Sequence, residues 1–174
     1  AHGDRLRVGV KLRWLARLHW FELGSSSATY RLAHEAIETL EALPPGRELA
    51  LAYSSLSHLH LVADDMAGAQ AWGLRAIELA EAVDDAEALC HALNNVGTAR
   101  LSQHDDGAAW ERLHRSLTLA LEHGLEQDAA RAYNNLFILC VVHRDFPLGM
   151  RYADEGIAYR EAGGLDLFNV RIRI

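Results

Sequence analysis

The sequence repeats itself every 40 residues, and this periodicity constrains the fold more than any other feature. Residues 53–81, 93–121 and 133–161 align with one another without a gap. Large apolar side chains recur at some matching positions and small side chains at others, which is the pattern needed where two elements pack closely. Examples are Leu56, Val96 and Leu136 for the large residues and Ala69, Ala109 and Gly149 for the small ones. We therefore expect each segment to form the same structural unit.

The spacing within a unit predicts two α-helices. Apolar residues recur at steps of three and four, as in Leu89, Leu93 and Val96, which places them on one helix face. The 28 alanines and 28 leucines of the chain are strong helix formers, and the chain has only three prolines. Short polar turns separate the helices, and the pairs Asp64-Asp65 and Asp84-Asp85 suit the capping of a following helix.

The repeat predicts one all-α domain, an α-α superhelix of four helical hairpins followed by a truncated helix. The expected units span residues 5–43, 46–83, 85–123 and 125–163, with a partial fifth unit at 165–174. The first unit is degenerate, and its first helix needs a one-residue slip that matches Leu15 to Leu56 and Ala16 to Ser57. Because the chain lacks an initial Met and ends within a repeat, we expect a fragment of a longer protein.

One side of such an array is expected to be concave and lined by the first helix of each unit. Polar residues recur there, including two asparagine pairs in mid-helix, where asparagine is a poor helix former. These amides suit either a bound peptide backbone or a bridge between repeats, and Arg131 suits a carboxylate. The candidate peptide- or effector-binding residues of this predicted groove are Ser54, Ser55, His58, His91, Asn94, Asn95, Thr98, Arg131, Asn134, Asn135 and Ile138.

The segment from Leu93 to Ser116, with Gly97 and Ala109 at fixed positions, resembles a tetratricopeptide repeat (TPR). The chain departs from the usual form in its longer period and in lacking a proline at the end of the second helix, where Glu81 and Leu121 stand. The resemblance implies a TPR-like solenoid that binds a protein or peptide.

Three further stretches, 92–99, 130–136 and 155–159, are similar to the helical region of large, ATPase-containing (MalT-like) LuxR-family transcription regulators. This resemblance implies a regulatory domain between an NTPase module and a helix-turn-helix, with a peptide, a protein or a small effector as its ligand. Neither a phosphate-binding loop nor a basic reading helix occurs in the sequence. Two alternatives stay open: an assembly scaffold that self-associates into a homo-oligomer, and the sensor region of an adenylate cyclase.

Composition and spacing argue against other functions. Residues 1–24 carry a net charge of +3 and the remainder −10, and a mostly acidic body disfavours direct nucleic-acid binding. His58 and His60 diverge on a helix, and Cys140 with His143 offers only two metal ligands. We therefore expect no catalytic residues, no metal and no cofactor. The absence of an apolar run of membrane-spanning length and of any Cys pair for a disulfide favours a cytoplasmic, non-membrane protein.

Overall fold

The computed structural model describes residues 2–100 and 106–162, and within these ranges the chain forms eight α-helices and no strand. The helices are α1 (His2–Leu23), α2 (Ser27–Glu41), α3 (Arg47–Val62), α4 (Met66–Ala82), α5 (Ala86–Ala99), α6 (Asp106–Glu122), α7 (Glu126–Val142) and α8 (Phe146–Ala162). The all-α prediction is confirmed, and the predicted fifth unit lies outside the described residues. None of these helices combines the length and apolar character needed to cross a membrane.

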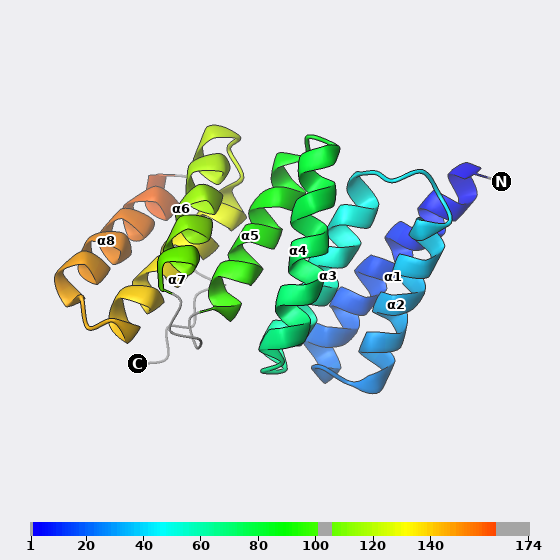
Figure 1. Cartoon of the computed structure of the whole chain (residues 1–174), viewed down its shortest axis with the longest axis horizontal. Helices are drawn as coiled ribbons and strands as arrows, with labels where there is room; N and C mark the ends of the chain where they lie inside the picture. Colours follow the sequence, from blue (N-terminus) through cyan, green and yellow to red (C-terminus); the bar gives the residue numbers. More distant parts are fainter. Residues whose placement is uncertain (1, 101–105, 163–174) are drawn as a thin grey trace.

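The helices form a row of hairpins, each packed on the next along the chain (Figure 1). The odd-numbered helices also pack in series, since α1 contacts α3, α3 contacts α5 and α5 contacts α7. Across the described residues, the even-numbered helices make no comparable contact with one another. The odd-numbered helices are therefore closer together and form the inner, concave side, as expected for a superhelix.

Four of the turns between helices share one backbone geometry. An amide donates to the carbonyl five residues earlier at four helix ends, over 2.8–3.0 Å: Asp65 to His60, Asp85 to Ala80, Leu125 to Ala120 and Asp145 to Cys140. The residue before each donor has a positive φ: Asp64, Asp84, Gly124 and Arg144. These are Schellman motifs, which satisfy the last carbonyls of each helix.

In the pairs Asp64-Asp65 and Asp84-Asp85, the two aspartates have different roles. The first takes the left-handed conformation, and the second caps the next helix through its carboxylate. Asp65 accepts a hydrogen bond from the amide of Gly68 at 2.9 Å, and Asp85 accepts one from that of Ala88 at 2.8 Å. The predicted capping role is confirmed, and it explains why each turn needs no more than two or three residues.

The core follows the predicted register of large and small residues. Leu56, Val96 and Leu136 are fully buried, as are the small residues Ala69 and Ala109. Gly73 shows how close the approach is, because a Cβ there would lie 2.3 Å from Val96 Cγ2. Helix α5 lies at the centre of the array and contacts α3, α4, α6 and α7.

The expected one-residue slip in the first helix is wrong. Ala16 is 4% exposed whereas Leu15 is 46% exposed, so Ala16 and not Leu15 occupies the position of Leu56, 40 residues later. The alignment therefore holds without a gap through α1. Helix α1 has small residues such as Gly9 and Ala16 on its buried face because it packs tightly on α2. A Cβ at Gly9 would lie 2.6 Å from the side chain of Leu40.

Candidate functional site

The inner surface consists of one solvent-accessible stripe on each of α3, α5 and α7. Seven of the predicted groove residues are half-buried or exposed and lie on these stripes: Ser55, His58, His91, Thr98, Arg131, Asn134 and Ile138. The other four, Ser54, Asn94, Asn95 and Asn135, are buried beneath the stripes. The sequence therefore located two layers of one region: a surface that solvent reaches and a polar layer below it.

The buried layer is a ladder of hydrogen bonds between repeats. Asn95 Nδ2 donates to the carbonyl of Ser54 at 2.8 Å, and Asn135 Nδ2 donates to Asn94 Oδ1 at 2.5 Å. Both bonds join residues 41 positions apart, one more than the 40-residue repeat. Each asparagine therefore donates to the residue that directly precedes its own equivalent in the repeat before it. This is the bridging role that the sequence analysis left open for the asparagines.

Further bonds attach this ladder to α6 and join α7 to α5. Asn94 Nδ2 donates to Ser116 Oγ on α6 at 3.2 Å, and Ser116 Oγ donates to the carbonyl of Cys90 at 3.0 Å. Asn135 Nδ2 also donates to Thr98 Oγ1 at 2.9 Å. Because a buried amide without a partner is costly, these contacts hold the inner helices in one relative position.

Arg131 lies where the ladder meets the surface. One guanidinium nitrogen, Nη2, donates to Asn95 Oδ1 and lies 3.4 Å from Nδ1 of His58. The other, Nη1, is buried and has no hydrogen-bond partner. Burial lowers the pKa of Arg131 to about 10, which leaves the side chain charged at neutral pH.

Two histidines beside Arg131 are held neutral. Burial, with the charges of Arg131 and Arg17, lowers the pKa of His58 to about 3. Burial, followed by the charge of Arg131, also places the pKa of His91 well below its usual value. His91 Nδ1 lies 2.6 Å from Ser54 Oγ, and the ring of His58 meets that of Trp20 edge-on at 5.3 Å between centroids.

The sequence analysis missed three charged residues of this region. Arg13 and Arg17 lie one turn apart on α1, and Asp128 lies one turn before Arg131 on α7. Burial raises the pKa of the Asp128 carboxyl to about 6, although the positive charges of Arg131 and Arg17 oppose the shift. The i,i+4 and i,i+3 spacings were visible in the sequence, but nothing in it indicated that α1 and α7 approach each other.

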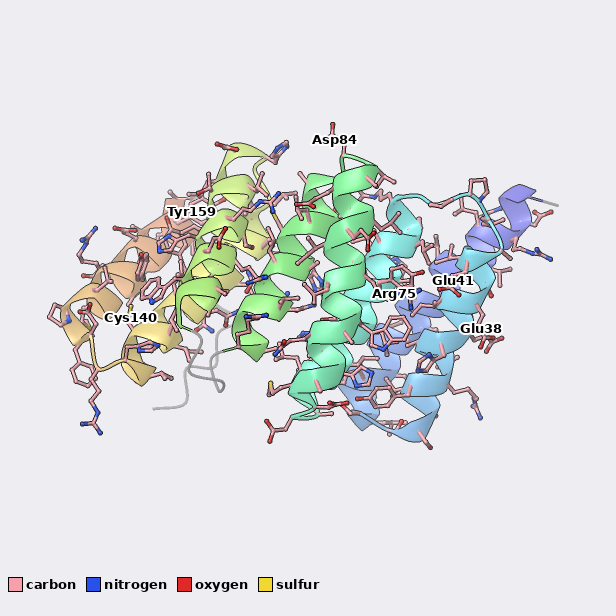
Figure 2. All side chains as sticks on the ribbon, viewed as in Figure 1. Glu38, Glu41, Arg75, Asp84, Cys140 and Tyr159 are labelled. Atoms are coloured by element: carbon pink, nitrogen blue, oxygen red, sulfur yellow. The ribbon has the colours of Figure 1, made fainter. Side chains whose placement is uncertain are left out.

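A second polar cluster lies on the other side of the array, at the boundary of α2, α3 and α4. Arg75 donates to Glu41 Oε1 at 2.9 Å and to the hydroxyl of Tyr53 at 2.8 Å, and it stacks on the rings of Tyr53 and Trp72. Figure 2 shows Arg75 and Glu41 facing the same boundary between neighbouring helices. Arg75, Glu41 and the Tyr53 hydroxyl bond to one another, so we interpret this cluster as a contact between repeats.

The described residues offer no group of three metal-ligating side chains. His60, one of the histidines considered as a ligand, instead lies 2.8 Å from Asp65 through Nδ1, at the cap of α4. Cys90 and Cys140 are buried free thiols, and burial raises the pKa of Cys90 to about 12.

No family model matches the chain. Over 151 residues it is 32% identical to the "Regulatory protein AfsR" of Streptomyces griseus, a match that covers 84% of this chain and 15% of that protein. The chain is thus homologous to one segment of a regulatory protein and spans 15% of the length of this relative.

Two solved structures have the same fold. The aspartyl phosphate phosphatase F of Bacillus subtilis superposes with a TM-score of 0.78 at 17% identity, over 92% of this chain and 42% of that chain. BtubC from P. vanneervenii superposes with a TM-score of 0.77 at 22% identity, over 98% of this chain and 69% of that chain. These likenesses establish the helical-repeat architecture, and at such identities they establish nothing more.

Proposed function

We propose that this chain is a non-catalytic interaction domain that regulates a larger cytoplasmic protein, with a LuxR-type transcription regulator as the most suitable parent. Its ligand is a peptide, a segment of a protein partner or a small effector bound on the inner surface. The observation that carries the proposal is the set of three solvent-accessible, mostly polar stripes on α3, α5 and α7, with the asparagine ladder below them. Homology to a regulatory protein is consistent with this role.

Such a surface regulates by binding one arrangement of the repeats better than another. A ligand that contacts Ser55, Thr98 and Ile138 together touches three consecutive repeats, and it favours the curvature at which all three contacts are made. The shift in the parent is limited by the difference in the ligand's affinity for its two states.

The test is a selection of linear peptides from a random display library against the folded domain. Peptides of about 12 residues are suitable, because an extended chain of that length can cross three packed helices. Ile138→Arg on the inner surface is the test variant. Leu74→Arg on the outer helix α4 is its control, because the two residues have similar exposure, 39% and 43%. We expect Ile138→Arg to weaken the selected peptides about tenfold or more and Leu74→Arg to leave them unchanged. If the affinity of the selected peptides is unchanged in both Ile138→Arg and Thr98→Arg, this surface is excluded as the binding site.

Self-association is a second candidate, and the exposed apolar residues of the two ends favour it. Helix α1 exposes Leu15, Leu18 and Phe21, and α8 exposes Phe146 and Met150. Apolar surface of this kind indicates a contact with another protein surface. Light scattering over a wide concentration range distinguishes the two: a mass that rises with concentration and falls in Leu18→Arg supports the scaffold.

A further inference from the structure

We propose that the outer boundary of α6, α7 and α8 binds an arginine side chain of a protein partner, which stacks on Tyr133 and Tyr152 and pairs with Glu155. This inference goes beyond the proposed function, because it concerns the outer helices and not the inner surface. It follows from a comparison of two equivalent places in the array, which are 80 residues apart in the sequence. One is the boundary of α2, α3 and α4, and the other is the boundary of α6, α7 and α8.

At the boundary of α2, α3 and α4, the chain itself supplies an arginine. The guanidinium carbon of Arg75 lies 4.3 Å from the ring centroid of Tyr53 and 4.6 Å from that of Trp72. The same guanidinium donates to Glu41 and to the Tyr53 hydroxyl. A guanidinium is planar, so its face stacks on aromatic rings while its edge donates hydrogen bonds. Two aromatic rings and one carboxylate therefore suffice to hold an arginine at this position.

The boundary of α6, α7 and α8 has the two rings and a carboxylate, but a different residue in place of the arginine. The residues 80 positions after Tyr53, Trp72, Arg75 and Glu41 are, in this order, Tyr133, Tyr152, Glu155 and Leu121. Both positions with aromatic rings stay aromatic, and the arginine is replaced by a residue of opposite charge. The cation–π contacts of the described residues involve only the rings of Trp14, Phe21, Tyr53 and Trp72. No described arginine or lysine therefore stacks on the two tyrosines of this boundary.

The two tyrosines and Glu155 lie close together. A Cβ on Gly156 would lie 2.9 Å from Cβ of Tyr133, so Tyr133 packs directly against the backbone of α8 beside Glu155. The Tyr152 hydroxyl lies 3.1 Å from Nε2 of His114 on α6, which holds this ring at the boundary between α6 and α8. Burial raises the pKa of both tyrosines, and the nearby carboxylate of Glu155 adds to the rise in each.

The carboxylate of Glu155 is accessible to a cation from a partner. Arg75 and Arg115 each pair with a glutamate 34 positions earlier, across a boundary between repeats. Leu121 stands at the corresponding position for Glu155, so this boundary has no such ion pair. Glu155 instead lies 3.9 Å from Arg151 on its own helix, and both side chains are largely exposed. An exposed pair of this kind contributes little, so an arginine that also stacks on two rings would displace Arg151.

A titration of the tyrosine ring resonances by NMR tests the site. The probe is N-acetyl-arginine amide, which represents an arginine within a chain. It is compared at constant ionic strength with the citrulline analogue, which has a similar shape without the charge, and with the lysine analogue. We expect saturable shifts of Tyr133 and Tyr152 with the arginine probe, about tenfold weaker binding of citrulline and about threefold weaker binding of lysine. If either analogue binds as tightly as the arginine probe, the proposal is overturned.

Variants of Glu155 assign the shifts to this site, and the exposure of its side chain makes a folding defect improbable. Glu155→Gln should weaken binding of the arginine probe about fivefold. Glu155→Arg places an arginine at the position equivalent to Arg75, and it should abolish binding because the new guanidinium covers the rings. Asp154→Asn is the matched control, because it removes the adjacent exposed carboxylate of α8 and should bind as the wild type.

Unchanged affinity in Glu155→Gln, or an equal loss in Asp154→Asn, overturns the arginine site. Peptides selected on the inner surface should bind Glu155→Gln as tightly as they bind the wild type. The arginine site and the proposed function can therefore fail independently of each other.

Discussion

Single residues of the asparagine ladder determine whether the inner helices hold together. Asn95 donates to the carbonyl of Ser54 and accepts from Arg131, so its removal takes one hydrogen bond from each of these two groups. We expect Asn95→Ala to lower the free energy of unfolding by about 2–4 kcal/mol. Ser55→Ala is the control, because the Ser55 hydroxyl bonds only to the carbonyl of Leu51 in its own helix. Urea denaturation measures both, and equal losses in the two variants would contradict the bridging role.

Glycine at position 73 is required by the close approach of α4 to its neighbours. We expect Gly73→Ala to destabilise the fold by about 1–3 kcal/mol, because the new Cβ would overlap Val96 and approach Ser57 Oγ to 2.9 Å. Gly107→Ala is the matched control on α6: its Cβ meets nothing within 4 Å, so it should stabilise by up to about 1 kcal/mol. Thermal unfolding followed by circular dichroism separates the two, and a neutral Gly73→Ala would contradict the packing described.

Sequence analysis identified some residues of the inner surface and missed others, and the difference has a physical reason. Periodicity identified Asn94 and Asn95 because they break helix propensity at equivalent positions of a repeat. It could not separate Asn94 and Asn95, which are buried, from Ser55 and Asn134, which solvent reaches, because helix spacing resolves a face but not its depth. Arg17 was missed because its approach to Arg131 depends on the curvature of the whole array.

At the scale of elements, two local features form the turns: a residue in the left-handed conformation that ends one helix, and an aspartate that caps the next. The aspartate caps and the glycine turns were predictable from the sequence. Each Schellman motif needs one residue in the left-handed conformation, and glycine adopts it without the steric cost that other residues incur. Gly124 adopts this conformation in one turn. In two others it is adopted by Asp84 and Arg144, which carry a Cβ and so incur the steric cost. The helices and their turns were therefore predictable, whereas the register of α1 was not, because Ala16 offers no large apolar residue to mark it.

This comparison predicts a stabilising substitution. Arg144→Gly should raise the free energy of unfolding by about 0.5–1 kcal/mol, since it relieves the strained φ of +59° between α7 and α8. Gly124→Ala is the reciprocal control and should lower it by about the same amount, because φ there is +64° and nothing else contacts the added Cβ. Chemical denaturation measures both changes, and changes of the same sign would refute the shared turn geometry.

On the scale of the whole molecule, stability should fall from the centre of the array toward its ends. Among the helices that the structure describes, α5 contacts four others and carries ten buried residues, whereas α8 contacts only α7 and carries two. We expect amide hydrogen exchange to be slowest in α5 and fastest in α1 and α8. Uniform protection across all helices would show that the array unfolds only as one unit.

The buried titratable groups make the stability of the molecule depend on pH. The pKa of His58 is about 3 in the folded state against 6.5 for the free side chain, so the unfolded state binds more protons between these values. The free energy of unfolding should therefore fall by about 2 kcal/mol for this group between about pH 7 and pH 5. His91 adds a loss of the same sign.

Asp128 opposes this loss, since its pKa of about 6 means that the folded state binds the extra proton there. Asp128→Asn should consequently make the decline with acidification steeper, by about 1 kcal/mol at about pH 5. Urea titrations of both proteins at the two pH values measure the difference. A shallower decline in the variant would contradict the assigned direction.

The one-sided packing of the array also bears on its mechanics. Within residues 2–100 and 106–162, inner helices touch their counterparts in the next repeat whereas outer helices do not, so each hairpin has a line of contact about which it can pivot. Small rotations at successive lines of contact add up along the array, and the two ends then move much further than any one pair of helices. A molecule bridging α3, α5 and α7 would lock these pivots together and convert a local binding event into a change of orientation between whatever is attached to the two ends.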